Sequence, residues 1–485
     1  ETRIAIVAES PGRDENYKGI PLVGVSGQLL DSALGRIGIS RAQCFVGNVC
    51  QAFPGEGKDF NKFDWNGPEV QAGIRQLRQD LETFAPTIVL CLGNAALHAL
   101  KHGGVEPPKK GGQFDWPSKI GDWRGSLFWS EWAGVKAVAT YHPAALIRDY
   151  SLQGYWRAQA GVGDLERLKK EAGSRELVLP GRDIRICAPR YGYTAEAAAD
   201  IIRSLPQTLA SDIEGSPTNI TCIAYAPSAD LAHVIPFAGI DGVSIWSEAE
   251  EVILWEAVKE RQENPSAVTI GQWYSYDAFS MAWSLGITTL GRVWDIAELF
   301  WELWPELDKG LDVQASLLTK EPFYKPDKAR EDGQTRLVFA SDEQFWHYNG
   351  LDACVTFQCW ERAMELLGAR AKQQEAEARR LWRHMPTTTE LQKGNHSEEA
   401  AKEALMQPAL VGGTGGCNTA GHSAIEITYQ PCTCLSHAAF NSSLFAPAKL
   451  YPMLRGIRVD KQRVEEEREK AALGVWELQA LVDGE

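Results

Sequence analysis

Short apolar runs alternate with amphipathic segments through the first third of the chain. Four bounded apolar runs stand out, "RIAIVAE", "CFVGNV", "TIVLCLG" and "VKAVATYH". Such runs are typical of strands in a parallel sheet that is covered on both faces. The segments "SGQLLDSALGRIG" and "PEVQAGIRQLRQDLETFAP" between them repeat apolar residues with helical spacing. The pattern predicts an α/β domain over residues 1–172, with three layers around a central parallel sheet.

A second α/β pattern follows over residues 173–372. The runs "TLASDIEG", "NITCIAYAP" and "LAHVIPFA" predict three successive strands. They are followed by a helical segment, "EEVILWEAVKERQEN", a strand, "VTIGQW", and a further helix, "SYDAFSMAWSLG". Early strands followed by α/β alternation favour a mixed sheet.

The pattern is lost after this second unit. Residues 373–445 have weak periodicity and many small residues, so we expect a linker or an irregular insert. Residues 446–485 recover a charged, helical pattern in "DKQRVEEEREKAALGVWELQALV".

Charge and cysteine usage narrow the class of protein. The net charge of −15 argues against a generic nucleic-acid binder. Residues 1–172 are nearly neutral, with 20 Lys and Arg against 19 Asp and Glu, which leaves 29 against 45 for the rest. This acidity fits either metal sites or a solvated surface. The ten cysteines lie mostly in apolar runs, as reduced thiols of a cytosolic-type protein do.

Three acidic motifs of the second unit predict a metal site. Asp212 and Glu214 flank one residue of a strand, so both side chains lie on the same face. Asp277 follows another strand, and Tyr348 and Asp352 share a helix face at i, i+4. A single D-x-E pair is usually a surface feature. Together, four carboxylates make an oxygen-rich cage for two Mg²⁺ or Mn²⁺ ions that hydrolyse a phosphodiester.

These motifs resemble those of a nuclease family. "ASDIEG", "GQWYSYDAF" and "YNGLDACVT" are similar to the three motifs of the DEDDy 3′–5′ proofreading exonucleases fused to family-A DNA polymerases. "KGLDVQASLLTKEPFYKPD" resembles the connecting region of phage-type members. The resemblance implies a ribonuclease-H-like fold, four acidic metal ligands, and a Tyr348 that orients the attacking water. Trp273 stands where the family usually has Asn, so strand positioning is expected to differ. A degenerate relic that only holds DNA is the alternative.

The first loop of the first unit suggests a different kind of chemistry. "AESPGRDENYKGIPLVGVSGQLLDSAL" lacks the glycine spacing of dinucleotide-binding and P-loop sites. Glu9, Asn48 and His142 each follow a predicted strand, and the carboxyl ends of parallel strands meet at one edge of the sheet. Taken singly, a strand-end Asn is usually a cap and a lone His a structural hydrogen bonder. Together they can read a base edge and perform acid–base chemistry on it.

The loop, with "HPAALIR" and "LETFAPTIVLCLGNAAL", resembles the family-4 branch of the uracil-DNA glycosylase superfamily over residues 3–170. By this resemblance, Glu9 positions or activates the hydrolytic water and Asn48 reads the uracil edge. His142 would stabilise charge that develops on the base. Leu146 and Arg148 would wedge into the duplex as the nucleotide flips.

Two departures from that family are visible. Leu22 stands where the family has the Phe that stacks on uracil, so this substrate-binding position bears on base discrimination. The family's iron–sulfur cysteine positions hold Ala52 and Gly73, so we expect no iron–sulfur cluster.

The sequence thus predicts a bifunctional DNA repair and proofreading hydrolase, which flips and excises uracil and trims 3′ ends. The alternatives are a uracil-sensing or DNA-binding module with only the exonuclease active, and a non-catalytic scaffold for a DNA polymerase. "LYPMLRGIRVDKQR" resembles the segment that joins exonuclease to polymerase, so a polymerase is a possible partner, alongside DNA. We expect no membrane association, and a cytoplasmic location of bacterial or phage type or one at the nucleoid.

Overall fold

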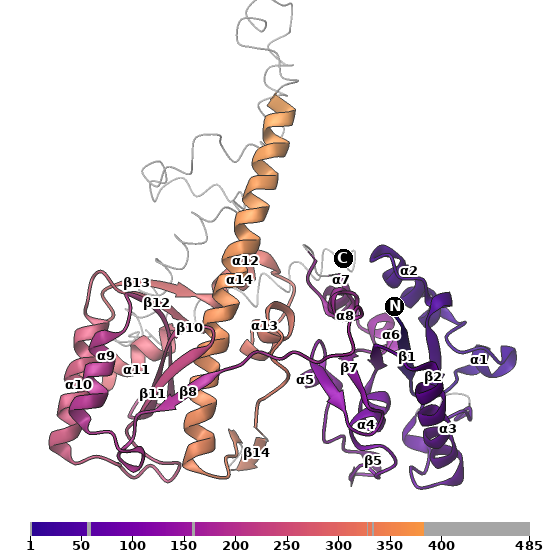
Figure 1. Ribbon diagram of the computed structural model, residues 1–485, viewed down its shortest axis with the longest axis horizontal. Helices are drawn as coiled ribbons and strands as arrows, with labels where there is room; N and C mark the ends of the chain where they lie inside the picture. Colours follow the sequence, from indigo (N-terminus) through magenta and orange to yellow (C-terminus); the bar gives the residue numbers. More distant parts are fainter. Residues whose placement is uncertain (1, 56–59, 158–160, 327, 332–333, 383–485) are drawn as a thin grey trace, which may run out of the picture.

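Two α/β units lie side by side (Figure 1). The computed structural model describes residues 2–55, 60–157, 161–326, 328–331 and 334–382. The long helix α14 (Asp342–Trp382) packs on the second unit and extends well beyond its sheet. This helix continues past the expected domain boundary at residue 372. The rest of the expected linker and the segment 446–485 lie outside the described residues.

The first sheet has five strands in the order β2-β1-β3-β7-β6. Its strands are β1 (Ile4–Ala8), β2 (Phe45–Asn48), β3 (Ile88–Leu92), β6 (Leu127–Ser130) and β7 (Val135–Thr140). The neighbours β2-β1, β1-β3 and β3-β7 pair in parallel, as predicted. The edge strand β6, which the sequence pattern did not reveal, pairs antiparallel with β7.

Helices cover both faces of this sheet, which explains why its central strands are apolar throughout. In β1, Ala5 and Val7 pack with residues of α3 and α4, whereas Ile4 and Ile6 pack with residues of α2, α6 and α8. The helices of this unit are α1 (Arg13–Lys18), α2 (Val25–Arg36), α3 (Pro68–Phe84), α4 (Asn94–His102), α5 (Ile120–Trp123), α6 (Pro143–Arg148), α7 (Gly154–Arg157) and α8 (Asp164–Glu171). The three-layer α/β prediction is confirmed.

The second sheet has six strands in the order β13-β12-β9-β10-β11-β8. Its strands are β8 (Asp183–Ile186), β9 (Thr208–Ser216), β10 (Asn219–Ser228), β11 (Leu231–Pro236), β12 (Val268–Gly271) and β13 (Arg292–Asp295). The strands β9, β10 and β11 form an antiparallel meander, while β12 pairs in parallel with both β9 and β13. This is the mixed sheet that the sequence predicted.

Two groups of helices cover the second sheet. Residues of α9, α10 and α11 pack on one face, and residues of α12, α13 and α14 pack on the other. Their bounds are α9 (Ala195–Ser204), α10 (Glu248–Gln262), α11 (Ser275–Leu285), α12 (Ile296–Leu303) and α13 (Leu311–Leu318). Two small hairpins pair β4 (Lys109–Lys110) with β5 (Gln113–Phe114) and β14 (Lys328–Glu331) with β15 (Gln334–Leu337). Within the described ranges, no helix has the length and apolar character that crossing a membrane requires.

Buried polar contacts join the two units. The Arg124 guanidinium is 2% exposed, lies 3.9 Å from the centre of the Tyr155 ring and bonds to the Ser316 hydroxyl of α13. It also lies 3.5 Å from the Asp164 carboxylate, which is fully buried. Tyr155 belongs to the same apolar cluster as residues of α12, α13 and α14. The Arg124–Ser316 bond and this shared apolar cluster connect the two units.

Candidate functional site

The carboxyl ends of β1 and β2 bring Glu9 and Asn48 together. Asn48 is the register partner of Ala8, the residue before Glu9. The chain stays paired beyond the strands, because the N–H of Val49 donates to the Ala8 carbonyl and that of Cys50 to the Glu9 carbonyl, both at 3.0 Å. The predicted carboxylate and amide therefore lie on neighbouring chain segments at one edge of the sheet.

His142 follows β7 at the same edge. It is the N-cap residue of α6, and its Nδ1 accepts a hydrogen bond from the N–H of Ala144 at 3.2 Å. Nδ1 is therefore unprotonated, and Nε2 is the donor of the neutral ring. Burial, with a smaller effect from Arg148, lowers the pKa of His142 to about 4. The ring is thus a neutral hydrogen-bond donor at physiological pH.

A cavity of about 390 Å³ opens beside Asn48. It lies along β2 and is lined on the other side by the loop around α1, with Pro11, Pro21 and Phe45 among its walls. Neither Glu9 nor His142 is among the residues that line it. The structure thus gives Asn48 access to a hollow large enough for a nucleobase. Glu9 follows the neighbouring strand β1, whereas His142 follows β7, which is separated from β1 by β3.

Leu22 packs into the core next to this cavity. Its side chain is 3% exposed and belongs to the apolar cluster that contains Leu30. Its φ of +54° is left-handed, and its carbonyl accepts from Arg41 Nη1 at 2.7 Å. A Cβ on Gly27 would lie only 1.6 Å from that carbonyl oxygen, so only glycine fits there. A contact between Leu22 and substrate stays a prediction.

The two predicted wedge residues have different environments. Leu146 is fully buried in the core, and its carbonyl accepts from Gln153 Nε2 at 3.1 Å. A side chain that completes the core cannot enter a base stack without leaving a cavity. The wedge role of Leu146 stays a prediction, and it would require this side chain to leave the core. Arg148, in the last turn of α6, is exposed and remains available to DNA.

The residues at the family's cluster positions do not fit an iron–sulfur cluster. Ala52 and Gly73 offer no thiolate. A Cβ on Gly73 would lie 2.4 Å from the Val49 carbonyl oxygen, so α3 contacts the chain after β2 directly. Cys50, which is buried beside this contact, accepts from the Ala52 N–H at 3.4 Å through its sulfur. The expected lack of a cluster stays a prediction.

A second candidate site lies on the second sheet. The side chains of Asp212 and Glu214 on β9 and Asp352 on α14 each offer an oxygen, and these oxygens lie within 4.8 Å of one another. Asp277, in the first turn of α11, is buried close by, and its Oδ1 accepts from the Ile213 N–H at 3.1 Å. Three elements thus deliver the four predicted carboxylates to one place.

The electrostatics of this cluster favour a bound cation. Burial and the neighbouring Asp352 raise the pKa of Asp212 to about 8. Burial, and next the charge of Asp212, raise the pKa values of Glu214 and Asp277 well above their usual range. Crowded, desolvated carboxylates repel one another, and a divalent cation offsets this repulsion. The donor set therefore fits a hard divalent metal ion.

Three residues that were not predicted also belong to this site. The Lys325 ammonium donates to Asp352 Oδ2 at 2.7 Å and to the Tyr348 hydroxyl at 2.5 Å. Tyr324 donates to the other Asp352 oxygen. Asn349 donates to Asp212 Oδ2 at 2.7 Å. Asn349 directly follows the predicted Tyr348, so the sequence could have suggested it. Tyr324 and Lys325 lie on an irregular segment without periodicity, which gave no such signal.

Trp273, at the position of the family's Asn, has an unusual backbone. Its φ is +53° and its side chain is 43% exposed. The N–H groups of Trp273 and Tyr274 donate to the Asp295 carboxylate at 3.2 and 3.0 Å. These bonds hold the strained turn between β12 and α11, and so fix where α11 and its Asp277 begin.

The first unit is a three-layer α/β domain with a polar cluster at the carboxyl edge of its sheet. Residues 1–166 match the family model of the uracil DNA glycosylase superfamily. The type-4 uracil-DNA glycosylase of Pyrobaculum aerophilum is 32% identical over 169 residues, which are 34% of this chain and 79% of that protein. Its counterpart from Archaeoglobus fulgidus is 33% identical over 150 residues, 30% of this chain and 68% of that protein. The chain belongs, through this domain, to the uracil DNA glycosylase superfamily.

Solved structures resemble the chain only weakly. Brucella melitensis NrnC bound to pGG has a TM-score of 0.27 and 16% identity, and covers 41% of this chain and 88% of its own. Escherichia coli RNase D, an exoribonuclease involved in structured RNA processing, has a TM-score of 0.27 and 15% identity, with 39% of this chain and 46% of its own covered. A TM-score of this size establishes no shared activity, so only the carboxylate cluster's own geometry bears on its chemistry.

Proposed function

We propose that the chain processes DNA with two hydrolytic centres. The first domain is a uracil-DNA glycosylase, which is supported by its family membership and by a carboxylate, an amide and a neutral imidazole at one sheet edge. The second is a metal-dependent 3′–5′ exonuclease. The observation that supports it is the group of Asp212, Glu214 and Asp352, with oxygens within 4.8 Å of one another. We also propose that the first domain ends at residue 172 and the second at residue 372.

In the glycosylase centre, each residue has a task that its chemistry allows. The Asn48 amide offers both a donor and an acceptor to the edge of a flipped uracil. The Nε2–H of His142 donates to the base as negative charge develops there during cleavage of the glycosidic bond. Glu9 orients the hydrolytic water. Arg148 contacts DNA beside the flipped nucleotide, where extrusion costs a few kcal/mol.

In the exonuclease centre, Asp212, Glu214, Asp277 and Asp352 would hold Mg²⁺ or Mn²⁺. When bound, such ions polarise a phosphodiester and lower the pKa of water. Tyr348 orients the attacking water through its hydroxyl group. Asn349 keeps Asp212 in place by its 2.7 Å hydrogen bond. The Ile213 N–H does the same for Asp277, so both carboxylates are held before substrate arrives.

Excision is tested with labelled duplex DNA that contains one uracil. We expect alkali to break the strand at the uracil after incubation with the chain, but not after incubation with Asn48→Ala. Asn66→Ala, at an exposed asparagine that contacts Glu106, is the matched control and should excise normally. If alkali reveals no abasic site with the wild-type chain, the domain does not excise uracil.

Nuclease activity is tested on 3′ ends in Mg²⁺ or EDTA. We expect loss of 3′ degradation in EDTA and in Asp212→Asn, and full activity in Asp183→Asn, which changes an exposed aspartate on β8. Degradation that persists in EDTA and in Asp212→Asn would show that this cluster is not the nuclease centre.

A second candidate for the first domain is a uracil sensor that binds without excision. Leu22 bears on this alternative, because its buried side chain stands where the resemblance places a Phe that stacks on uracil. If the chain binds uracil-containing DNA selectively but creates no abasic sites in it, the sensor is supported. A polymerase partner and a cytoplasmic or nucleoid location stay predictions, since the segment that resembles a polymerase junction lies outside the described residues.

A further inference from the structure

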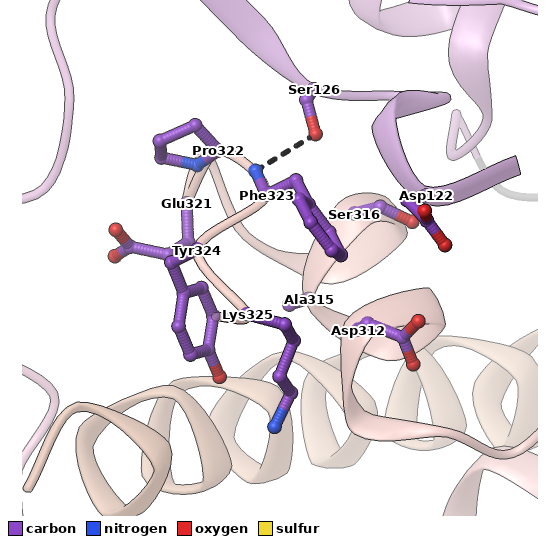
Figure 2. A pocket seen from close by; sticks show the side chains of 10 residues that line it. All are labelled: Asp122, Ser126, Asp312, Ala315, Ser316, Glu321, Pro322, Phe323, Tyr324 and Lys325. Carbon is purple, nitrogen blue, oxygen red and sulfur yellow. Dashed lines mark hydrogen bonds between the residues drawn. The ribbon is translucent and has the colours of Figure 1, made fainter. Parts of the chain in front are cut away.

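The segment 319–325 bridges the two domains and ends in the carboxylate cluster. We name it the bridging segment. Figure 2 shows Tyr324 and Lys325 extending from it toward the helix beneath, while the Phe323 ring extends into the pocket, toward Ser316 in this view. On that helix, α14, their partners are Asp352 and Tyr348.

The first domain anchors this segment on one side. The Phe323 N–H donates to the hydroxyl of Ser126, which is 1% exposed, at 3.0 Å (Figure 2). The Phe323 ring packs on Trp123 of α5 with ring centroids 5.9 Å apart. Lys320 pairs with Glu171 of α8 at 2.7 Å. Three separate contacts with the first domain therefore fix the course of the bridging segment.

The second domain fixes the same segment near its middle. Glu321 is 8% exposed and pairs with Arg182 at 2.9 Å. Four residues after Glu321, the side chain of Lys325 reaches the carboxylates. It is 17% exposed, and its ammonium lies 2.7 Å from Asp352 Oδ2. The cluster thus contains a cation of the protein's own at a carboxylate that the proposed function assigns to metal binding.

Lys325 also restricts Tyr348. An ammonium can only donate, so the 2.5 Å contact occupies a lone pair of the Tyr348 oxygen. The Tyr348 O–H is then directed away from Lys325, and the Asp352 carboxylate beside it is a side-chain partner for this group. The one ammonium thus bridges the side chains of Asp352 and Tyr348, which lie one turn apart on α14.

We propose that Lys325 is a positioning residue of the nuclease centre, held in place by the first domain, which both orients Tyr348 and shares Asp352 with the metal site. The inference rests on the proposed exonuclease. It makes the glycosylase-like domain a structural part of the second active site. Removal of Lys325 should therefore strengthen metal binding, because a competing positive charge is lost, and should weaken catalysis, because Tyr348 is no longer oriented.

Calorimetric titration of the full chain with Mn²⁺, without DNA, tests the first half. We expect the Lys325→Met variant to bind Mn²⁺ with a dissociation constant at least tenfold lower than that of the wild type. We also expect this variant to degrade 3′ ends at least tenfold more slowly at saturating Mn²⁺. Lys325→Arg keeps the charge and should stay within about threefold of the wild type in both measurements. A merely structural role would weaken both properties together. Unchanged or weaker Mn²⁺ binding by Lys325→Met, or wild-type turnover, would overturn the proposal.

The role of the first domain is tested in the same titration. Ser126→Ala combined with Phe323→Ala loosens the bridging segment without touching the cluster. We expect Mn²⁺ binding to tighten in this variant, and no further tightening when Lys325→Met is added. Ser130→Ala, at another buried serine of the first domain, should bind as the wild type does. Wild-type affinity in the Ser126/Phe323 variant would refute anchoring by the first domain.

These outcomes separate the inference from the proposed function. If the wild-type chain binds no Mn²⁺ and leaves 3′ ends intact, the exonuclease itself is wrong. If it binds and cuts but Lys325→Met has the same affinity for Mn²⁺, only the role of Lys325 is wrong.

Discussion

The Nδ1 atom of His142 accepts a hydrogen bond from the Ala144 N–H at 3.2 Å, so the first turn of α6 selects one tautomer of this ring. Burial, and to a lesser degree Arg148, lowers the pKa of His142 to about 4. The folded state therefore favours the neutral ring, and protonation works against folding.

The consequence is a defined pH dependence of stability. The contribution of His142 is complete above the unfolded value of about 6.5 and is lost as the pH falls toward 4. Between pH 7.5 and 4.5, we expect the free energy of unfolding of the wild type to fall more steeply than that of His142→Gln, by up to about 3 kcal/mol. Urea denaturation at a series of pH values measures this. Parallel curves for the two proteins would contradict the buried, neutral state of the ring.

The residues Leu146 and Arg148 of α6 should separate stability from DNA binding. Leu146→Ala removes a fully buried side chain and should lower the free energy of unfolding by about 2–5 kcal/mol. Arg148→Ala removes an exposed charge, and should leave stability within about 0.5 kcal/mol while it weakens binding to a uracil-containing duplex. Urea denaturation and fluorescence anisotropy measure the two effects. Normal stability of Leu146→Ala would indicate that this side chain is free to act as a wedge.

Local sequence spacing predicted many residues of the site. It did not predict the residues that reach the site from distant parts of the sequence. Asp212 and Glu214 share a face because side chains along a strand alternate with period two. Tyr348 and Asp352 share a face because side chains four residues apart lie on the same side of a helix. Motif position did not show which face of α6 meets the core, and so the burial of Leu146 was not foreseen. Lys325 was out of reach, because its place depends on Phe323 and Ser126, which are 197 residues apart in the sequence.

The interface between the domains depends on Gly125. Its φ is +74°, and a Cβ there would lie 2.9 Å from both Asp164 Oδ1 and the Ser316 carbonyl oxygen. Gly125→Ala should therefore cost more than the roughly 1–2 kcal/mol of a left-handed backbone alone, because the domains must also move apart. Gly134→Ala is the matched control, with a φ of +60° and nothing within 4 Å of its Cβ. Thermal unfolding should show a clearly larger loss for Gly125→Ala, and equal losses would mean that the close approach is unimportant.

Metal binding should stabilise the second domain. Mn²⁺ at one hundred times its dissociation constant adds about 2.7 kcal/mol to the free energy of unfolding, or a Tm increase of roughly 5–10 °C for a domain of this size. EDTA should reverse the increase, and Asp212→Asn should abolish it. Differential scanning calorimetry measures the effect, with Asp183→Asn as the control that keeps it. An equal Tm increase in Asp212→Asn would place the bound metal elsewhere.

The strained backbone of Trp273 gives the last prediction. At a φ of +53°, most side chains cost roughly 1–2 kcal/mol, whereas Asn is among the residues that tolerate this region. Trp273→Asn should therefore keep or raise stability, although it removes a large, half-exposed side chain. Trp273→Val, with a β-branched residue, should be clearly less stable than Trp273→Asn.

The same pair of variants tests what the indole does in the nuclease. An exposed aromatic ring four residues before Asp277 suits stacking on a base of the 3′ strand, which is worth about 1–3 kcal/mol per base. Trp273→Asn should therefore raise the KM for single-stranded 3′ ends by about tenfold, with kcat nearly unchanged, since Asp277 and its bond to the Ile213 N–H stay in place. A fall in kcat at constant KM would instead indicate that Trp273 acts by fixing the start of α11 and not by binding the strand.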